Sequence, residues 1–298
     1  MAPEAESRWR LVESIAVQLG STREARWIVD YAGTELAQAM ADRRGAGEPL
    51  QYVLGSWPFR TVELQVDPRV LIPRPETEYM VGVALGELDR ICRGSGIGEP
   101  ASGPPTGPRG PGTRRIGVDL GTGSGAIALS LAVEGKTRCP NLDVWATDAS
   151  TDALDVARAN LESLDRVDPE AAGRVRLAHG SWFDALPVGL VGRVDLLVSN
   201  PPYVTESEYP DLDPSVREWE PREALVASSG ALGAEGMAAI EAIVSGAPRW
   251  LARSGAVVIE IAPMLAGASV AAARRAGFTH VVIERDLAGR PRVLVARW

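Results

Sequence analysis

A short run of polar and rigid residues follows the apolar stretch 194–198, and it reads Asn200-Pro201-Pro202-Tyr203. The amide of Asn200 offers one acceptor and two donors, while the two prolines fix φ and remove backbone donors. The Asn200 oxygen and the Pro201 carbonyl are therefore suited to accept both hydrogens of a planar NH2 group, with the Tyr203 ring against its plane. The alternative is a rigid turn, but four such residues at a strand end are more specific than an isolated Asn-Pro pair.

A glycine-rich turn, Gly121-Thr122-Gly123-Ser124-Gly125, lies between a predicted strand and a predicted helix. Glycines permit a tight turn and let backbone N–H groups approach a ligand at a helix N-terminus. Together with Ala126 the run also fits the dinucleotide pattern G-x-G-x-x-G/A. Alone it indicates either a cofactor that contains adenosine or an ordinary glycine-rich turn. Asp119, just before it, could fix the loop or reach a cationic group of a ligand.

An acidic residue, Asp148, ends the next predicted strand. A carboxylate at this place can accept hydrogen bonds from both ribose hydroxyls of an adenosine cofactor. It could also cap the helix that follows, because Asp, like Ser150 and Thr151, is favoured at helix N-caps. Combined with the glycine turn, the ribose interpretation is the better one.

Strands and helices alternate through the part of the chain that carries these residues. Strands are predicted at 115–119, 143–148, 175–179, 194–199, 256–261, 280–285 and 292–298, and helices notably at 150–164, 234–252 and 264–276. This alternation predicts an α/β fold with a mostly parallel sheet and helices on both faces. The turn at 286–291 is too short for a crossover helix, so the last two strands must be antiparallel. Asn200 then lies at the carboxyl end of a strand, where open α/β sheets bind ligands.

The front of the chain has a different pattern. Residues 1–44 predict three helices, with a capping box at Ser21 to Glu24. Alternation over Val62 to Val66 predicts a strand, which Leu71-Ile72 could join as a hairpin before a helix at 76–91. Residues 93–114 are rich in Gly, Pro and Ser and predict a mobile loop. We therefore divide the chain into a helical domain (1–50), a hairpin with a linking helix (51–92), the loop (93–114) and the α/β domain (115–298).

Composition excludes several classes of protein. The chain has 45% hydrophobic and 23% charged residues and a net charge of −8, which argues weakly against a nucleic-acid backbone as the main partner. No apolar run approaches the ~20 residues that span a bilayer, and the first residues do not resemble a signal peptide. Cys92 and Cys139 are far apart and lack metal-type spacing, so we expect a reducing cytoplasm and no metal site. We assign no role to His179 or His280, the only histidines.

The glycine turn and the run from Asn200 to Tyr203 together resemble the class I S-adenosylmethionine-dependent methyltransferases that alkylate planar amino groups. These include DNA adenine-N6 and protein glutamine-N5 enzymes. Nearly the whole chain is similar to the glutamine-N5 methyltransferases of peptide chain release factors. The runs that carry this likeness are 48–55 (EPLQYVLG), 72–78 (IPRPETE), 180–183 (GSWF), 219–221 (WEP) and 286–289 (DLAG), with Phe59, Ala224, Leu225 and Arg292.

The resemblance implies a seven-stranded Rossmann-like sheet, with a small N-terminal helical domain that docks a class 1 release factor. It implies methyl transfer from S-adenosyl-L-methionine to the N5 of a glutamine, leaving S-adenosyl-L-homocysteine. By position, Gly121, Thr122, Gly123, Ser124 and Gly125 would hold the methionine end of the cofactor, Asp148 its ribose and Trp182 its adenine region. Asn200 would lie at the cofactor's edge and, with Pro201, Pro202 and Tyr203, would grip the glutamine.

The chain departs from the family pattern at three places. Ala262 and Leu265 stand where the family usually has Gly and Gln. The sequence of residues 228–232 matches the family's usual motif at that place only loosely. The insertion at 93–114 is also unusual. These differences bear on local loops and not on the proposed sites. For Trp182, packing is the alternative role. We expect Glu76 and Glu78 to lie in the first turn of a helix, where the helix dipole favours acidic residues.

Four other functions remain open. A glutamine on a ribosomal protein would suit the same chemistry. A DNA adenine-N6 methyltransferase shares Asn200 to Tyr203 but should carry a basic recognition region, whereas this chain is acidic. A dinucleotide oxidoreductase would leave that run unexplained. A non-enzymatic scaffold would bind the cofactor without transferring its methyl group.

Overall fold

The computed structural model describes residues 3–93, 113–227, 230 and 235–298 of the chain. Seven strands form one sheet in the order β5-β4-β3-β6-β7-β9-β8. They are β3 (Arg115–Leu120), β4 (Leu142–Asp148), β5 (Val175–His179), β6 (Val194–Ser199), β7 (Leu251–Glu260), β8 (His280–Arg285) and β9 (Pro291–Arg297). Each overlaps a predicted strand, and the predicted α/β class is confirmed.

The order of the strands places a ligand crevice between β3 and β6. From β3 the chain proceeds outward through β4 and β5, and then it returns to β6 on the other side of β3. β3 pairs in parallel with both β4 and β6. This reversal is the switch point at which open α/β sheets bind ligands. β9 runs antiparallel to β7 and β8, which confirms the orientation predicted for the last two strands.

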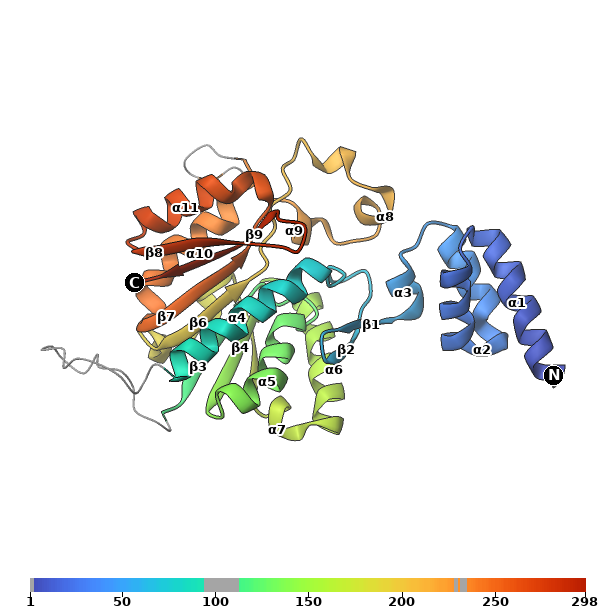
Figure 1. Ribbon diagram of the computed structural model, residues 1–298, viewed down its shortest axis with the longest axis horizontal. Helices are drawn as coiled ribbons and strands as arrows, with labels where there is room; N and C mark the ends of the chain where they lie inside the picture. The colour runs from blue at the N-terminus through green and yellow to red at the C-terminus, as the bar shows by residue number, and fades with distance from the viewer. Residues whose placement is uncertain (1–2, 94–112, 228–229, 231–234) are drawn as a thin grey trace, which may run out of the picture.

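Helices cover both faces of this sheet (Figure 1). The first face carries α4 (Pro75–Arg93), α5 (Ala126–Arg138) and α6 (Thr151–Val167), and the second carries α10 (Ala238–Trp250) and α11 (Ala266–Arg275). Side chains of β6 alternate between the two cores: Leu196 and Val198 pack in the first and Leu197 in the second. Because both faces are buried, β6 is mostly apolar and lacks a regular alternation, as in other parallel sheets, and its buried Asp195 accepts from the Ile116 N–H at 2.9 Å.

Shorter elements connect these layers. They are α7 (Pro169–Ala172), α8 (Pro214–Arg217), α9 (Arg222–Leu225) and 3₁₀ turns at Trp182–Ala185, Val188–Leu190, Tyr209–Asp211 and Pro263–Leu265. The helix predicted at 234–252 ends at Trp250 because β7 already begins at Leu251. Most of the loop predicted at 93–114, and most of 228–232, lie outside the described residues.

The first helices form a separate packed unit at one end of the molecule (Figure 1). α1 (Pro3–Leu19) packs on α2 (Thr22–Gly45), and their core includes Ile15, Ile28 and Val29. Gly33 has φ 66° and interrupts α2, which accounts for the two helices predicted there. Ser21 accepts from the Glu24 N–H at 3.2 Å, as predicted, but the Glu24 carboxylate accepts from Arg44 Nε at 2.8 Å. The capping box is therefore only half formed.

The predicted hairpin has a different partner. β2 (Val62–Gln65) pairs antiparallel with β1 (Ser56–Phe59), and Leu71-Ile72 is part of a loop. The prediction missed β1 because Pro58 interrupts it, and proline within a run argues against a strand unless that strand lies at an edge. α3 (Leu50–Leu54) joins this two-stranded sheet to α2.

The two cysteines are bonded to each other. Cys92 in α4 and Cys139 at the end of α5 form a disulfide with their Cα atoms 5.9 Å apart. They are 47 positions apart in the sequence, and the packing of α4 on α5 brings them together. Their sequence distance was therefore no guide to their distance in space.

Candidate active site

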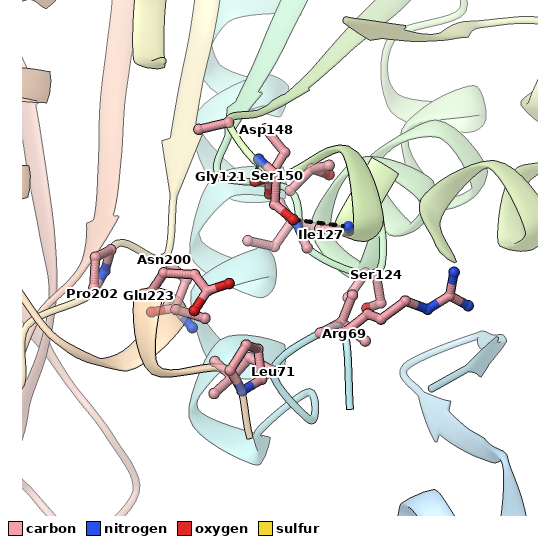
Figure 2. Close-up of a pocket in the computed structure, with 18 of the residues that line it drawn as sticks. Arg69, Leu71, Gly121, Ser124, Ile127, Asp148, Ser150, Asn200, Pro202 and Glu223 are labelled. Carbon is pink, nitrogen blue, oxygen red and sulfur yellow. Dashed lines mark hydrogen bonds between the residues drawn. The ribbon is translucent and has the colours of Figure 1, made fainter. Parts of the chain in front are cut away.

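A cavity of about 250 Å³ opens at the carboxyl ends of β3, β4, β5 and β6 (Figure 2). Most of the residues predicted for the site line it: Gly121, Thr122, Gly123, Ser124, Asp148, Trp182, Asn200 and Pro202. Gly125, Pro201 and Tyr203 are not among its lining residues. The structure thus brings together groups from four strand ends that are up to 81 positions apart in sequence, from Gly121 to Pro202.

Asp119, which lies in β3 just before the glycine turn, holds the turn in place through hydrogen bonds. Asp119 is fully buried, and its Oδ2 accepts from Thr122 Oγ1 at 2.6 Å and from the Ala128 N–H at 3.2 Å. Burial raises the pKa of the Asp119 carboxyl to about 7, although the bond from Thr122 opposes this shift. Of the two roles considered for Asp119, these contacts favour fixing the loop.

The glycines of the turn have different tasks. Gly123 has φ 55°, and a Cβ there would meet nothing within 4 Å. Gly125 has φ 86° and is the N-cap of α5, where a Cβ would lie 3.4 Å from Leu129 and 3.6 Å from Ala157. Gly123 therefore exposes backbone to the cavity, whereas Gly125 permits α5 to pack closely on α6.

Asp148 binds the glycine turn directly. Its Oδ2 accepts from the Gly123 N–H at 2.9 Å, and its Oδ1 accepts from the Ser150 N–H at 2.9 Å. Ser150, and not Asp148, caps α6 by accepting from the Ala153 N–H at 3.1 Å. Burial raises the pKa of Asp148, and the backbone bonds from Ser150 and Gly123 act in the opposite direction. The carboxylate lies beside Gly121 and Ser150 at the cavity wall (Figure 2).

Trp182 has an unusual backbone conformation. Its φ of 46° lies in the left-handed region, which residues other than glycine rarely adopt. Such strain is concentrated at functional sites. A Cβ added at Gly121 would lie 3.7 Å from Trp182 Cζ3, so the indole borders the glycine turn.

Asn200 is connected to two residues, Thr77 and Glu260, that were not among the predicted site residues. Its Nδ2 donates to Thr77 Oγ1 at 3.1 Å, and Thr77 Oγ1 donates to Glu260 Oε2 at 2.7 Å. Burial raises the pKa of Glu260 to about 7. The signal for Thr77 was present, because it lies in the run 72–78 that carried the family resemblance.

Other residues of the family runs support the cavity without lining it. Glu220 is buried and accepts from the Ile72 N–H at 3.2 Å and from Arg74. Glu76 and Glu78 lie in the first turn of α4, as predicted. Glu76 Oε1 is also 3.5 Å from Arg292, and Glu78 accepts from the Arg60 N–H at 3.2 Å.

Tyr203 packs behind the cavity. Its ring lies against the second core, and burial raises the pKa of its hydroxyl to about 12. The two departures from the family pattern, Ala262 and Leu265, are buried in the same core and do not line the cavity.

Comparison with known proteins decides the family. Residues 110–212 match the family described as the methyltransferase small domain. The chain is 35% identical over 300 residues to the release factor glutamine methyltransferase of Bifidobacterium longum, covering 99% of this chain and 92% of that protein. It is 39% identical over 254 residues to the one from Bordetella pertussis, covering 85% and 79%. The chain belongs to the release factor glutamine methyltransferases.

Membership of the release factor glutamine methyltransferases confirms the resemblance found in the sequence and implies S-adenosyl-L-methionine as the methyl donor. A solved structure of the N-terminal domain of human METTL16 has a TM-score of 0.50 at 16% identity, covering 85% of this chain and 81% of that one, and supports the fold alone. No helix in the described part of the chain is long and apolar enough to cross a membrane. The described residues include no group of three or more His, Cys, Asp or Glu placed to hold a metal.

Proposed function

We propose that this chain transfers a methyl group from S-adenosyl-L-methionine to the side-chain amide nitrogen of a glutamine in a class 1 release factor, the glutamine of its Gly-Gly-Gln motif. One observation carries the proposal: the Asp148 carboxylate and the Asn200 amide line one cavity, on opposite sides of the glycine turn between their strands. The names of the relatives favour a release factor over a ribosomal protein or DNA adenine.

The cavity fits the cofactor in its chemistry. Its walls include apolar side chains such as Leu71 and Ile127, and a carboxylate and an amide converge on it from different strands. Cofactor sites are usually apolar clefts with a few placed polar groups. When bound, the cofactor supplies an electrophilic methyl group on a positively charged sulfur.

We assign the cofactor contacts by position. Asp148 would accept hydrogen bonds from the ribose hydroxyls, because each carboxylate oxygen can accept more than the one N–H that it already binds. Trp182 would border the adenine. The glycine turn at 121–124 would border the methionine end, while the N–H groups of Gly121 and Thr122 donate to the Thr147 carbonyl and that of Gly123 to Asp148.

Asn200 would orient the substrate. An amide nitrogen is a weak nucleophile because its lone pair is delocalised into the carbonyl, so its alignment with the methyl group matters. The Asn200 oxygen and the Pro201 carbonyl would accept the two N–H hydrogens and stabilise the charge that develops on the nitrogen. The prolines would hold that carbonyl still. Stacking of Tyr203 on the glutamine stays a prediction.

The remaining assignments concern the whole chain. We propose that residues 1–50 dock the release factor, that 51–92 link them to the rest, and that 115–298 form the methyltransferase domain. We propose that the enzyme acts in the cytoplasm, where translation terminates, and that its direct partner is neither a membrane nor a nucleic acid.

The proposal is tested with labelled cofactor and a purified class 1 release factor. Mass spectrometry should locate one methyl group on the glutamine of Gly-Gly-Gln. A release factor with alanine in place of that glutamine should take up no label. Methylation of another protein or of DNA, with none on the release factor, would reject the proposed substrate.

A further inference from the structure

Two buried side chains and the half-buried Asn200, from distant segments, form a hydrogen-bonded chain that ends at the cavity. Asn200 follows β6, Thr77 lies in the first turn of α4, and Glu260 ends β7. Asn200 Nδ2 lies 3.1 Å from Thr77 Oγ1, which lies 2.7 Å from Glu260 Oε2. Thr77 is 4% exposed and Glu260 1%, so the contact between Thr77 and Glu260 is shielded from water. A buried carboxylate is costly unless it is hydrogen-bonded, and the Thr77 hydroxyl supplies such a bond to Glu260.

When Glu260 is ionised, the donors and acceptors of these hydrogen bonds follow from its charge. An ionised carboxylate only accepts hydrogen bonds, and a hydroxyl has one hydrogen to donate. The Thr77 hydrogen therefore points to Glu260, and the Thr77 lone pair faces Asn200. Asn200 must then present its NH2 group to Thr77, which leaves its oxygen for other partners. That oxygen is the acceptor that an incoming NH2 group needs.

Protonation of Glu260 removes this constraint. A protonated carboxyl can donate to Thr77, whose own hydrogen can then turn to Asn200. The Asn200 amide could then flip by 180°, with its oxygen on Thr77 and its NH2 group toward the substrate. Two NH2 groups would face each other, and the glutamine would lose its acceptor.

We propose that Thr77 and Glu260 are positioning residues that fix the orientation of the Asn200 amide, so that its oxygen faces the substrate glutamine. This inference rests on the function proposed above for Asn200. It adds Thr77, which also lines the cavity, and Glu260, which does not; both act on the substrate through Asn200.

Charged groups around Glu260 influence its pKa and therefore the pH range in which Glu260 is ionised and Asn200 is held in its orienting position. Arg292 on β9 and Arg74 before α4 lower the pKa of Glu260, and Glu76 in α4 raises it. Burial dominates and raises it to about 7, while Glu260 in turn raises the pKa of Tyr203. Since the ionised form is the orienting one, the rate of methyl transfer should rise as the pH increases through about 7.

The first test removes the hydroxyl of Thr77, the middle residue of the three hydrogen-bonded side chains. Thr77→Val keeps the shape but has no hydroxyl, and it should lower kcat on the order of 10-fold or more, as for other groups that position a reacting atom. Cofactor affinity by calorimetry and KM for the release factor should stay close to the parent values. Thr77→Ser should restore most of the rate. Ser130→Ala is the matched control, because the Ser130 hydroxyl is buried and has no hydrogen-bond partner among the described residues.

The second test replaces the carboxylate. Glu260→Gln is neutral and can donate, so it imitates the protonated state. It should lower kcat and abolish the rise in rate near neutral pH. Parent kcat and an unchanged pH profile in folded Thr77→Val and Glu260→Gln would overturn the inference.

A third measurement needs no substrate. The side-chain NH2 resonances of Asn200, assigned by their loss in Asn200→Ala, should shift as the parent is titrated through neutral pH. They should not shift in Glu260→Gln. This result would support the inference even if the release factor were not the substrate, and resonances independent of pH in the parent would overturn it even if Thr77→Val failed to fold.

Discussion

At the residue scale, the side chains around the cavity divide into those that present a group to it and those that hold such a group in place. Asp148 and Asn200 present a carboxylate and an amide. Asp119 holds the glycine turn, and Thr77 holds Asn200. The presenting residues were predictable, because each is a polar residue at the end of an apolar strand. Glu260 was not predictable, because its partner Thr77 is 183 positions away.

The role of Asn200 can be tested by two substitutions. Asn200→Ala should lower kcat on the order of 10²-fold, because a positioned acceptor is lost where charge develops in the transition state. Its effect on cofactor affinity should be small, since the glycine turn and Asp148 are on other segments. Asn200→Asp keeps an acceptor oxygen, so more residual activity than in Asn200→Ala is expected. Single-turnover methylation of a release-factor fragment measures both, and a parent rate in Asn200→Ala would reduce residues 200–203 to a rigid turn.

The role of Asp148 is tested by cofactor binding alone. Asp148→Asn retains one oxygen and the shape of the side chain but loses the charge and one acceptor. It should weaken binding of S-adenosyl-L-methionine by about 10-fold or more, since hydrogen bonds to charged groups contribute roughly 1.5–3 kcal/mol each. Isothermal titration calorimetry measures the affinity. Asp152→Asn, in the exposed first turn of α6, serves as a control for the loss of charge. Equal affinity in the parent and in Asp148→Asn would place the ribose elsewhere.

At the scale of elements, the sequence pattern located strands better than it located their partners. β6 was predictable because both its faces are buried and four of its six residues are apolar. β2 was also found, but its pairing with β1 was not, because partner choice depends on tertiary packing and on an edge strand that tolerates Pro58. The helices around Gly33 were predicted as two because glycine interrupts them. Local chemistry thus identifies elements, and packing decides their neighbours.

The glycine turn that precedes α5 gives a prediction about the stability of the protein. Gly125→Ala should destabilise the protein by about 1–2 kcal/mol, because alanine is strained in the left-handed region and its Cβ would lie 3.4 Å from Leu129 of α5, at the tight limit of van der Waals contact. Gly123→Ala carries similar backbone strain but meets no atom within 4 Å, so it should cost less. Urea unfolding of both variants compares them. A Gly123→Ala variant less stable than Gly125→Ala would contradict this division of tasks.

At the scale of the whole molecule, the runs that resemble the family converge on one region from distant parts of the chain. Glu220 binds Arg74 and the loop before α4, and Glu76 meets Arg292 of β9. These runs carried no evident chemistry in the sequence, and their contacts explain why: they hold the segments that frame the cavity. These runs could be recognised in the sequence by resemblance only, because an ion pair across 146 or 216 positions leaves no local pattern.

The disulfide between Cys92 and Cys139 gives a prediction for the stability of the whole chain. It closes a loop with a sequence separation of 47 and ties the end of α4 to the end of α5. A cross-link restricts the unfolded chain, so the oxidised protein should be more stable than the reduced one by about 2–4 kcal/mol. Urea unfolding with and without a reductant, after the free thiols are counted, measures the difference. A double variant, Cys92→Ser with Cys139→Ser, should unfold at the same urea concentration with or without reductant, and equal stability of the oxidised and reduced parent would contradict the prediction. Because neither cysteine lines the cavity, both forms should transfer methyl groups at the same rate, which a reducing cytoplasm would require.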